Sequence, residues 1–279
     1  MQSIQFAFLL SLFVLIILLH RRPFNRTPPL TFSDIRPRIQ SKPLYPKTML
    51  FTSHSYPKLP EFARIAIQSY TSYCDRNGIA YRDYTTPPNK TRVPPIWHRV
   101  MKLDKLCQTQ PSGVVIMYAD VDTMIKPQYL HININDVIDQ IDAVTGKRWD
   151  MYVGQDPGGA GLYRLNSGVL IVRNTAWTRS FLKRWLNMYD AVKWSQDSAY
   201  NWICDGYHQG GKYCYTEQGA LNQLWHHEVL NASRHIYLAH KSFFSDTDFQ
   251  SQSFMVHAMG VPNEFRNAWF KRLIRREFI

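Results

Sequence analysis

Residues 113–123 read GVVIMYADVDT, an apolar run that ends in two aspartates, Asp120 and Asp122. A continuous apolar run of this kind is typical of a strand that is buried on both faces of a parallel sheet. Open α/β sheets bind their ligands beyond the carboxyl ends of such strands. In an extended chain, residues two positions apart point to the same side. The sequence therefore predicts that both carboxylates project together into a ligand site.

The chain around this strand alternates between strand patterns and helical patterns. Further strands are predicted at residues 48–53, 79–84, 151–154, 168–173 and 254–257. Helices are predicted at residues 59–77, 97–107, 175–189 and 219–225 and at the basic carboxyl terminus, with Gly78 as the C-cap of the first. Alternating strands and helices form βαβ units with right-handed crossovers. We therefore predict an α/β fold, with a Rossmann-like, mixed but mostly parallel sheet flanked by helices.

The 279-residue chain carries a formal net charge of +12, and this charge is concentrated at its two ends. Residues 1–50 carry +6 and residues 261–279 carry +3, so residues 51–260 carry only +3. A nucleic-acid-binding protein is expected to carry its positive charge on the folded body. The distribution instead fits a body held next to an anionic membrane surface, and we expect no nucleic-acid partner.

Residues 1–19 contain no charged side chain, and a basic segment beginning at His20 follows them. A helix of this length, at ~1.5 Å per residue, just spans a thin bilayer. The segment lacks the basic amino-terminal region and the small-residue cleavage site of a cleaved signal peptide. We therefore predict a transmembrane signal anchor at 1–19, a proline-rich stem at 20–46 and one folded domain at 47–279.

Two carboxylates as close together as Asp120 and Asp122 repel each other unless they share a divalent cation. Hard oxygen ligands suit Mg²⁺ or Mn²⁺, and these ions keep free positions for phosphate oxygens. A cation on the diphosphate of a nucleotide-sugar neutralises charge as the glycosidic bond breaks. A second Asp-x-Asp, at Asp246 and Asp248, follows a loop-like segment, and we interpret it as a solvated turn.

Five blocks of sequence, in order along the chain, resemble the metal-dependent GT-A glycosyltransferases. The nearest resemblance is to the family of fungal Golgi galactosyl/mannosyltransferases and plant xyloglucan xylosyltransferases. The blocks are WHRVMKL at 97–103, YADVDT at 118–123, NSGVLIVRN at 166–174, EQGALN at 217–222 and VHAMG at 256–260. The resemblance implies a GT-A fold, a catalytic domain at 47–279, retention of anomeric configuration and a glycan acceptor. It also implies a nucleotide-sugar donor, with a UDP-sugar ahead of GDP-mannose.

The resemblance implies a third metal ligand, His257, beside Asp120 and Asp122. Imidazole suits Mn²⁺ better than Mg²⁺, so the expected cofactor is Mn²⁺. Gly260 would let the backbone approach a phosphate, as expected of a glycine in that block.

The remaining predicted site residues would contact the donor. Asn166, Ser167 and Gly168 are expected to hold its sugar and diphosphate. Either Arg99 or Lys102 is expected to meet the diphosphate, although basic residues on that helix equally form a solvated face.

Gln155 and Asp156 end a predicted strand, and Gln155 is expected to contact the donor. The candidates for catalysis are Asp156, Glu217 and Gln218. The Asp156 carboxylate is expected to accept hydrogen bonds from the donor sugar. A retaining mechanism needs a carboxylate or amide on the β-face of the sugar, and Glu217 or Gln218 is the candidate. The family more often has Asp before this Gln, so Glu217 departs from its pattern.

Aromatic side chains are dense in residues 177–225, and some of those within 200–215 are expected to stack on acceptor sugars. The i, i+4, i+8 spacing of Trp177, Phe181 and Trp185 instead predicts a core face. Cys204 and Cys214 flank a glycine-rich stretch and either close a small loop or are two separate buried thiols.

The predicted location is the Golgi or endoplasmic reticulum membrane, with a single-pass type II topology and a lumenal body. Three N-x-S/T sequons, at Asn25, Asn89 and Asn231, are compatible with it. The positive charge after the anchor counts against it, because the positive-inside rule leaves the body in the cytosol.

Two other functions remain open. A haloacid-dehalogenase-type phosphohydrolase also has Asp-x-Asp after a buried strand, but it expects Thr or Val where this chain has Met124. A catalytically silent, membrane-tethered glycan-binding protein is the alternative that is not an enzyme. Metal-dependent hydrolysis of UDP-sugars would argue against it.

Overall fold

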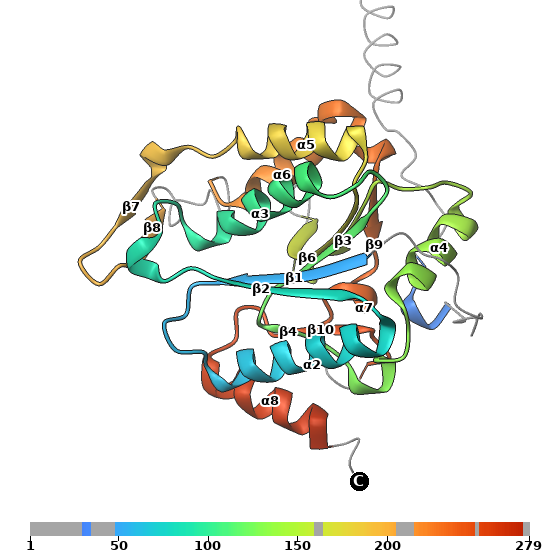
Figure 1. Cartoon of the computed structure of the whole chain (residues 1–279), viewed down its shortest axis with the longest axis horizontal. Helices are drawn as coiled ribbons and strands as arrows, with labels where there is room; N and C mark the ends of the chain where they lie inside the picture. Colours follow the sequence, from blue (N-terminus) through green and yellow to red (C-terminus); the bar gives the residue numbers. More distant parts are fainter. Residues whose placement is uncertain (1–29, 35–47, 159–163, 205–214, 249–250, 276–279) are drawn as a thin grey trace, which may run out of the picture.

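The computed structural model describes residues 30–34, 48–158, 164–204, 215–248 and 251–275 of the chain. Its centre is a six-stranded sheet with the order β2-β1-β3-β6-β5-β9 (Figure 1). The strands are β1 (Thr48–His54), β2 (Ala80–Thr85), β3 (Val115–Ala119), β5 (Met151–Gln155), β6 (Leu165–Arg173) and β9 (Ile236–Ala239). Five strands run in one direction, and β6 runs against its neighbours β3 and β5. The prediction of a mixed, mostly parallel sheet is confirmed.

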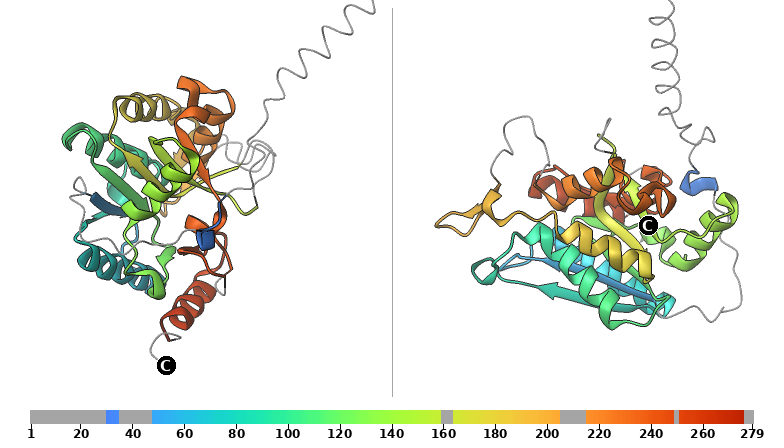
Figure 2. Two further views of the ribbon diagram at one scale, coloured as in Figure 1. Left: turned by 90° about the vertical axis from the view of Figure 1, so that its right-hand side faces the viewer. Right: turned by 90° about the horizontal axis from the view of Figure 1, so that it is seen from above.

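Helices cover both faces of this sheet (Figures 1 and 2). One face carries α3 (Pro95–Thr109), α5 (Ala176–Leu186) and α6 (Glu217–His226). The other face carries α2 (Glu61–Asn77) and the short α7 (Lys241–Phe244), and α8 (Asn263–Arg275) packs outside α2. α4 (Ile134–Thr145) contacts the amino end of β1 through an Asn135–Thr48 hydrogen bond of 3.1 Å. The carboxyl ends of the parallel strands lie at the other end of the sheet, where α/β folds bind their ligands.

Two small ribbons complete the described strands. β4 (Thr123–Ile125) pairs antiparallel with β10 (Met255–His257) beneath the main sheet, and β7 (Trp194–Gln196) pairs with β8 (Trp202–Cys204) in a hairpin that extends to the side (Figure 1). Short 3₁₀ turns are η1 (Phe32–Asp34), η2 (Pro88–Lys90), η3 (Pro127–Tyr129), η4 (Ala191–Lys193) and η5 (Val229–Arg234). The β4–β10 ribbon matters most here, because it joins the segment after β3 to the carboxyl-terminal part of the fold.

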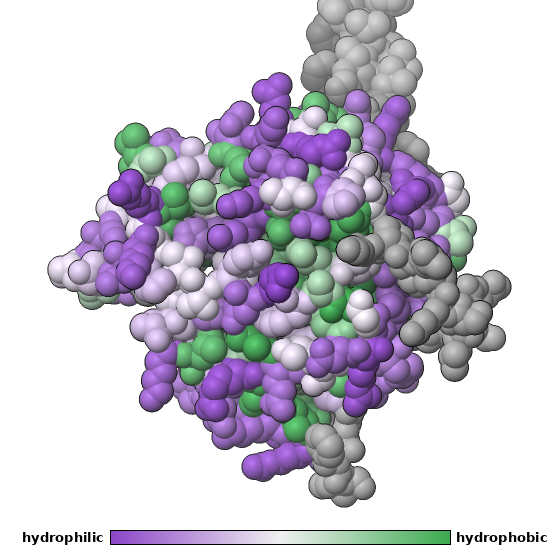
Figure 3. All heavy atoms as spheres, in the orientation of Figure 1, coloured by the Kyte–Doolittle hydropathy of each residue, from purple (hydrophilic) through white to green (hydrophobic). Residues whose placement is uncertain are grey.

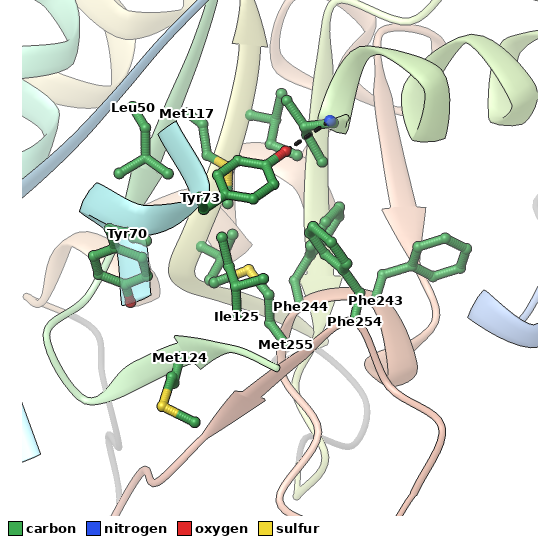
Figure 4. Packing of buried hydrophobic residues seen from close by; sticks show 14 of the residues in the cluster. Leu50, Tyr70, Tyr73, Met117, Met124, Ile125, Phe243, Phe244, Phe254 and Met255 are labelled. Atoms are coloured by element: carbon green, nitrogen blue, oxygen red, sulfur yellow. Dashed lines mark hydrogen bonds between the residues drawn. The ribbon is translucent and has the colours of Figure 1, made fainter. Parts of the chain in front are cut away.

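The two faces of the sheet bury separate hydrophobic clusters. On the α3–α5–α6 side, the Trp97 and Trp185 side chains are fully buried. On the α2 side, Tyr73 lies near the aromatic rings of α7 and of Phe254, which precedes β10, and its hydroxyl accepts a 2.7 Å hydrogen bond from the Ile134 amide (Figure 4). Burying one large side chain of this kind stabilises a fold by ~2–3 kcal/mol. The outer face in Figure 3 is largely polar, with hydrophobic side chains in small separate groups.

Local sequence signals explain most of the element boundaries. α2 ends at Gly78, which adopts a left-handed φ of 66° and donates its amide to the Cys74 carbonyl, as predicted. α3 begins with Pro95 in its first turn, a position where a missing amide hydrogen costs nothing. β6 begins at Leu165 rather than at Gly168, so the Asn166–Gly168 segment belongs to the strand itself.

Six of the described helices and strands were not predicted: α4, α7, β4, β7, β8 and β9. The α4 segment carries a clear helical signal, since Ile134, Val137, Ile138 and Ile141 are all buried and Asn133 caps the helix by accepting the Asn135 amide. β9 is only four residues long and partly exposed, and it pairs with β5 at the edge of the sheet. Strand patterns that short do not stand out from loop sequence.

Part of the predicted stem packs on the body. Phe32 is only 5% exposed, and its ring lies 4.9 Å from Tyr129 and 5.4 Å from Phe254. The predicted anchor, residues 1–19, and the rest of the stem lie outside the described residues. Among the helices that the structure does describe, none combines the length and the hydropathy needed to cross a bilayer.

The two core cysteines lead to a test of the fold. Burial raises the pKa of both Cys74 and Cys107 to about 12, so their thiols carry almost no thiolate at neutral pH. We expect both to resist iodoacetamide in the native protein and to react after denaturation in urea, as read by peptide mass spectrometry. Rapid labelling of either thiol without unfolding would contradict this packing.

Candidate active site

Three predicted metal ligands converge at the carboxyl end of β3. One ligand atom each from Asp120, Asp122 and His257 lies within 4.8 Å of the other two. The aspartates follow β3, and His257 ends β10. Residues far apart in the sequence are thus brought to one point, as the sequence predicted.

The two carboxylates are brought together by a turn rather than by an extended strand. The Asp120 carbonyl accepts hydrogen bonds from the Thr123 amide (3.1 Å), the Thr123 hydroxyl (2.8 Å) and the Tyr70 hydroxyl (2.7 Å). This is a tight turn over residues 120–123, between β3 and β4. The two carboxylates are close together, as predicted, but the predicted reason, an extended chain at residues 120–122, was wrong. Their proximity follows from a turn held by Tyr70 of α2.

His257 is positioned by pairing and by close packing. It pairs with Thr123 across the β4–β10 ribbon, and its amide donates to the Asp246 carbonyl at 2.8 Å. A Cβ placed on Gly168 would come within 2.3 Å of the His257 ring, so only glycine fits there. The His257 Nδ1 atom is buried and has no hydrogen-bond partner among the described residues.

The second Asp-x-Asp is not the solvated turn that was expected. Asp246 is only 3% exposed, and its carboxylate accepts the Asp248 amide at 3.0 Å and the Ser251 hydroxyl at 2.7 Å. Through its backbone carbonyl it supports His257. Asp246 is therefore a buried structural residue next to the site, whereas Asp248 is exposed.

Arg99 of α3 forms a two-point ion pair with Asp120. The guanidinium Nη1 lies 3.0 Å from Asp120 Oδ2, and Nη2 lies 2.9 Å from Oδ1. The Tyr118 hydroxyl also donates to Oδ1, and the Arg99 guanidinium lies over the Tyr118 ring. Burial raises the pKa of Asp120 above its usual value, although Arg99 opposes this effect.

Asp122 has different partners. Its Oδ1 lies 3.3 Å from His257 Nε2, and its Oδ2 lies 3.3 Å from Arg266 Nη2 of α8. Burial alone would raise the pKa of Asp122, but His257 and then Arg266 and Arg99 lower it to about 2. Asp122 is therefore ionised at any pH at which the protein would work.

Arg99 also joins the cluster to the α6 block. Its Nη1 lies 3.3 Å from Glu217 Oε1 and 3.1 Å from the Ser167 carbonyl oxygen. The Ser167 hydroxyl donates to Glu217 at 2.9 Å. Gln218 accepts the Ser167 amide at 3.0 Å and donates to Asp156 Oδ2 at 3.1 Å. The predicted residues of three separate blocks thus form one hydrogen-bonded network.

The amino end of β6 is shaped by side-chain hydrogen bonds. Asn166 accepts the Gly168 amide at 2.9 Å, and its Nδ2 lies 3.6 Å from the sulfur of Met259. Asn222 of α6 pairs with both the amide and the carbonyl of Leu165 at 2.9 Å. α6 therefore takes the place of a neighbouring strand where β6 reaches the site.

Three further predicted residues have other contacts or features. The Lys102 ammonium lies 4.7 Å from the centre of the Tyr84 ring. Gln155 ends β5, and its carbonyl accepts the Ser245 hydroxyl. Gly260 has a positive φ of 67°, which explains a glycine at that position.

Tyr118, Tyr70 and Arg266 are site residues that the sequence reasoning missed. Tyr118 lies in β3, two positions before Asp120, so alternation along the chain could have identified it. Tyr70 and Arg266 reach the cluster from α2 and α8, and no local pattern connects them with it.

The end of β1 offers further polar groups at the same edge. The Thr52 hydroxyl, the Ser53 hydroxyl and the His54 Nδ1 atom are buried without a hydrogen-bond partner in the part of the chain that the structure describes. His54 Nε2 is 3.3 Å from Asp83 Oδ1. Buried polar groups without partners are rare in proteins, and a ligand is one way to satisfy them.

The donor set of the cluster fits a divalent cation. Two carboxylates and an imidazole with an unsatisfied nitrogen are the ligand types that Mn²⁺ accepts. Ligands at ~2.1 Å from one ion lie no more than ~4.2 Å apart, so the 4.8 Å cluster needs only a small contraction.

Comparison with known proteins supports the fold. No protein-family model matches the sequence, and no curated protein does. The chain resembles the crystal structure of a glycosyltransferase involved in the glycosylation of the major capsid of PBCV-1, with a TM-score of 0.56 and 15% identity over 81% of this chain and 100% of that one. The galactosyltransferase LgtC, solved with donor and acceptor sugar analogs, has a TM-score of 0.39 and 12% identity over 81% of this chain and 95% of its own. The first likeness shows that the chain has the predicted GT-A fold.

Replacing Gly168 by Ala tests the close packing of His257. The added Cβ would displace the imidazole, so we expect Mn²⁺ affinity, measured by calorimetry, to fall ~10–100-fold. The control is Gly158→Ala, because a Cβ there would meet nothing closer than 3.7 Å. Equal Mn²⁺ binding by the two variants would contradict the described position of His257.

The low pKa of Asp122 predicts a pH-dependent stability. A carboxylate whose pKa is lower in the folded state, about 2, than in the unfolded state stabilises the fold above pH ~4 and loses this effect as the pH falls towards 2. Asp122→Asn should therefore lower the free energy of unfolding by ~2 kcal/mol at pH 6 but by only ~1 kcal/mol at pH 3. Urea unfolding in the presence of EDTA measures both values, and a cost that does not change with pH would contradict the ion pairs of Asp122.

Proposed function

We propose that this protein is a metal-dependent glycosyltransferase that moves a hexose or pentose from a nucleotide-sugar, most simply a UDP-sugar, to a glycan acceptor. The observation that carries the proposal is the Asp120–Asp122–His257 cluster at the ligand-binding edge of a GT-A sheet. A Mn²⁺ ion, or Mg²⁺ in its place, would supply charge to stabilise the departing diphosphate. The resemblance to the fungal and plant family supports the same activity.

The donor would lie along the edge of the sheet from β1 to β6. The unpaired polar atoms of Thr52, Ser53 and His54 are suited to a nucleoside, which presents several donors and acceptors. The amino end of β6 would hold the donor sugar, as the Asn166–Gly168 block predicts. This order places the diphosphate between the nucleoside and the sugar, next to the carboxylate cluster.

The catalytic candidates differ in burial and in hydrogen-bond partners, so we assign them different roles. Glu217 is 4% exposed and is bound to Arg99 and Ser167, so its carboxylate is suited to positioning. Gln218 and Asp156 are hydrogen-bonded to each other and are both partly exposed. We propose that these two side chains face the donor sugar and that the reaction retains anomeric configuration.

The acceptor would approach from the β7–β8 hairpin. Tyr200 at its tip is 52% exposed, and the Trp202 indole nitrogen donates to the Thr91 hydroxyl at 3.1 Å, which fixes the ring. Exposed aromatic rings pack well on the C–H faces of sugars. Tyr207, Tyr213 and Cys214, which were predicted to belong to this region, lie outside the described residues.

The cellular setting is proposed from the sequence. An anchor at 1–19 would tether the protein to a Golgi or endoplasmic reticulum membrane, with the body in the lumen. The exposed positions of Asn89 and Asn231 are compatible with a lumenal body. Protease protection in sealed vesicles measures this topology, and digestion of the body without detergent would overturn it.

Two alternatives are less well supported by the geometry. A phosphohydrolase of the haloacid-dehalogenase type needs its first aspartate as a free nucleophile, but both oxygens of Asp120 are held by Arg99. A silent glycan-binding protein does not require this Asp-Asp-His cluster, in which the histidine is buried and the two aspartates are partly exposed.

The decisive measurement is a panel of nucleotide-sugars assayed for hydrolysis and transfer with Mn²⁺ and with EDTA. We expect turnover of one donor with Mn²⁺, its loss in EDTA, and a fall of at least ~100-fold in Asp122→Asn, since cation charge is needed for departure of the diphosphate. Asp248→Asn is the control, because this exposed acid belongs to the second Asp-x-Asp. Full activity of Asp122→Asn in EDTA would overturn the proposal.

A further inference from the structure

Each carboxylate of the cluster has its own arginine, and the two arginines are held very differently. Arg99 binds Asp120 through two nitrogens and also contacts Glu217 and the Ser167 carbonyl. Arg266 meets Asp122 through a single nitrogen at 3.3 Å.

The Arg266 guanidinium has fewer partners than that of Arg99. Its Nε atom is buried without a hydrogen-bond partner among the described residues, and its other contacts are a hydrogen bond with the Tyr56 hydroxyl and the Phe62 ring, 5.2 Å away. The side chain is 15% exposed, so a path to solvent is open. Of the two arginines, Arg266 is therefore the one that can leave.

We propose that Arg266 is a positioning residue that occupies the cation's place on Asp122 until the cation arrives. This inference rests on the proposed metal-dependent function. The guanidinium neutralises Asp122 and keeps its carboxylate directed at His257, so the ligand set is preassembled. Arg266 contacts Oδ2 of this carboxylate, whereas Oδ1 faces His257. A divalent cation on Asp122 would therefore lie next to the guanidinium, and repulsion between the two positive charges would displace Arg266.

The competition links α8 to the metal site. Arg266 lies in the first turns of α8. The helix is also held to α2 by a 2.7 Å hydrogen bond from the Phe62 amide to Asn267, by the Phe270–Phe62 ring contact and by the Lys271–Glu61 ion pair of 2.7 Å. Cation binding removes a contact between α8 and the turn after β3, but it leaves these outer contacts in place. The amino-terminal part of α8 should therefore loosen when the site is filled.

The test is calorimetric titration of Mn²⁺ alone into the full chain in detergent. Removing the competing guanidinium in Arg266→Gln should strengthen Mn²⁺ binding by about tenfold, which corresponds to the loss of one partly buried ion pair. Lys271→Gln is the matched control, because it removes an equal charge from the same helix at a pair far from Asp122. It should leave Mn²⁺ affinity within about twofold, as a surface pair contributes little.

The outcomes separate this inference from the proposed function. If the unchanged protein binds Mn²⁺ and Arg266→Gln binds it equally or more weakly, the displacement is wrong and the metal site stands. If neither protein binds Mn²⁺, both proposals fail.

A second measurement covers the case in which Arg266→Gln does not fold. Amide hydrogen exchange on the unchanged protein should become faster in residues 263–268 when Mn²⁺ is added, while α3, which holds Arg99, stays as slow as before. Exchange in residues 263–268 that slows or stays the same would overturn the inference.

Discussion

The buried guanidinium of Arg99 is the point on which the arrangement of the site depends. It joins α3, the turn after β3, the amino end of β6 and α6 through contacts to Asp120, Ser167 and Glu217. Two negative carboxylates and a backbone carbonyl converge on one positive charge at low exposure. Breaking such a buried pair by removing one partner typically costs ~3–5 kcal/mol, so the four segments are strongly tied to one another.

Because β6 runs in the reverse direction, its first residues lie in this site. In a fully parallel sheet, only residues that follow strands reach the ligand edge. Because β6 runs against β3 and β5, its first residues, Asn166 to Gly168, lie beside the last residues of those strands. A strand can thus present glycine and small polar side chains directly under His257 without a loop.

Much of the fold and of the site composition could be read from the sequence. The buried run before Asp120, the helical spacing before Gly78 and the ordered motif blocks predicted the sheet, α2 and the Asp120–Asp122–His257 cluster. These predictions succeeded because each rests on a local pattern or on a resemblance of short blocks. The direction of β6 and the short β9 carry no such pattern, since strand direction depends on pairing partners that lie far away in the sequence.

The site residues that escaped prediction share one physical trait. Tyr70 and Arg266 act through the tip of a long side chain that comes from a helix packed on the far side of the turn. Their helices were predicted, but which residue faces the carboxylates depends on how α2 and α8 pack. Asp246 escaped for a related reason, since its burial comes from the β4–β10 ribbon and not from its own loop.

The β4–β10 ribbon has a consequence for the order of assembly during synthesis. Asp120 and Asp122 leave the ribosome early, whereas His257 and its pairing partner Thr123 meet only after the later strands and α6 have been made. A nascent chain that lacks β10 therefore holds Asp120 and Asp122 without His257. The proposed cation site would be completed only once β10 has been made and has paired with β4.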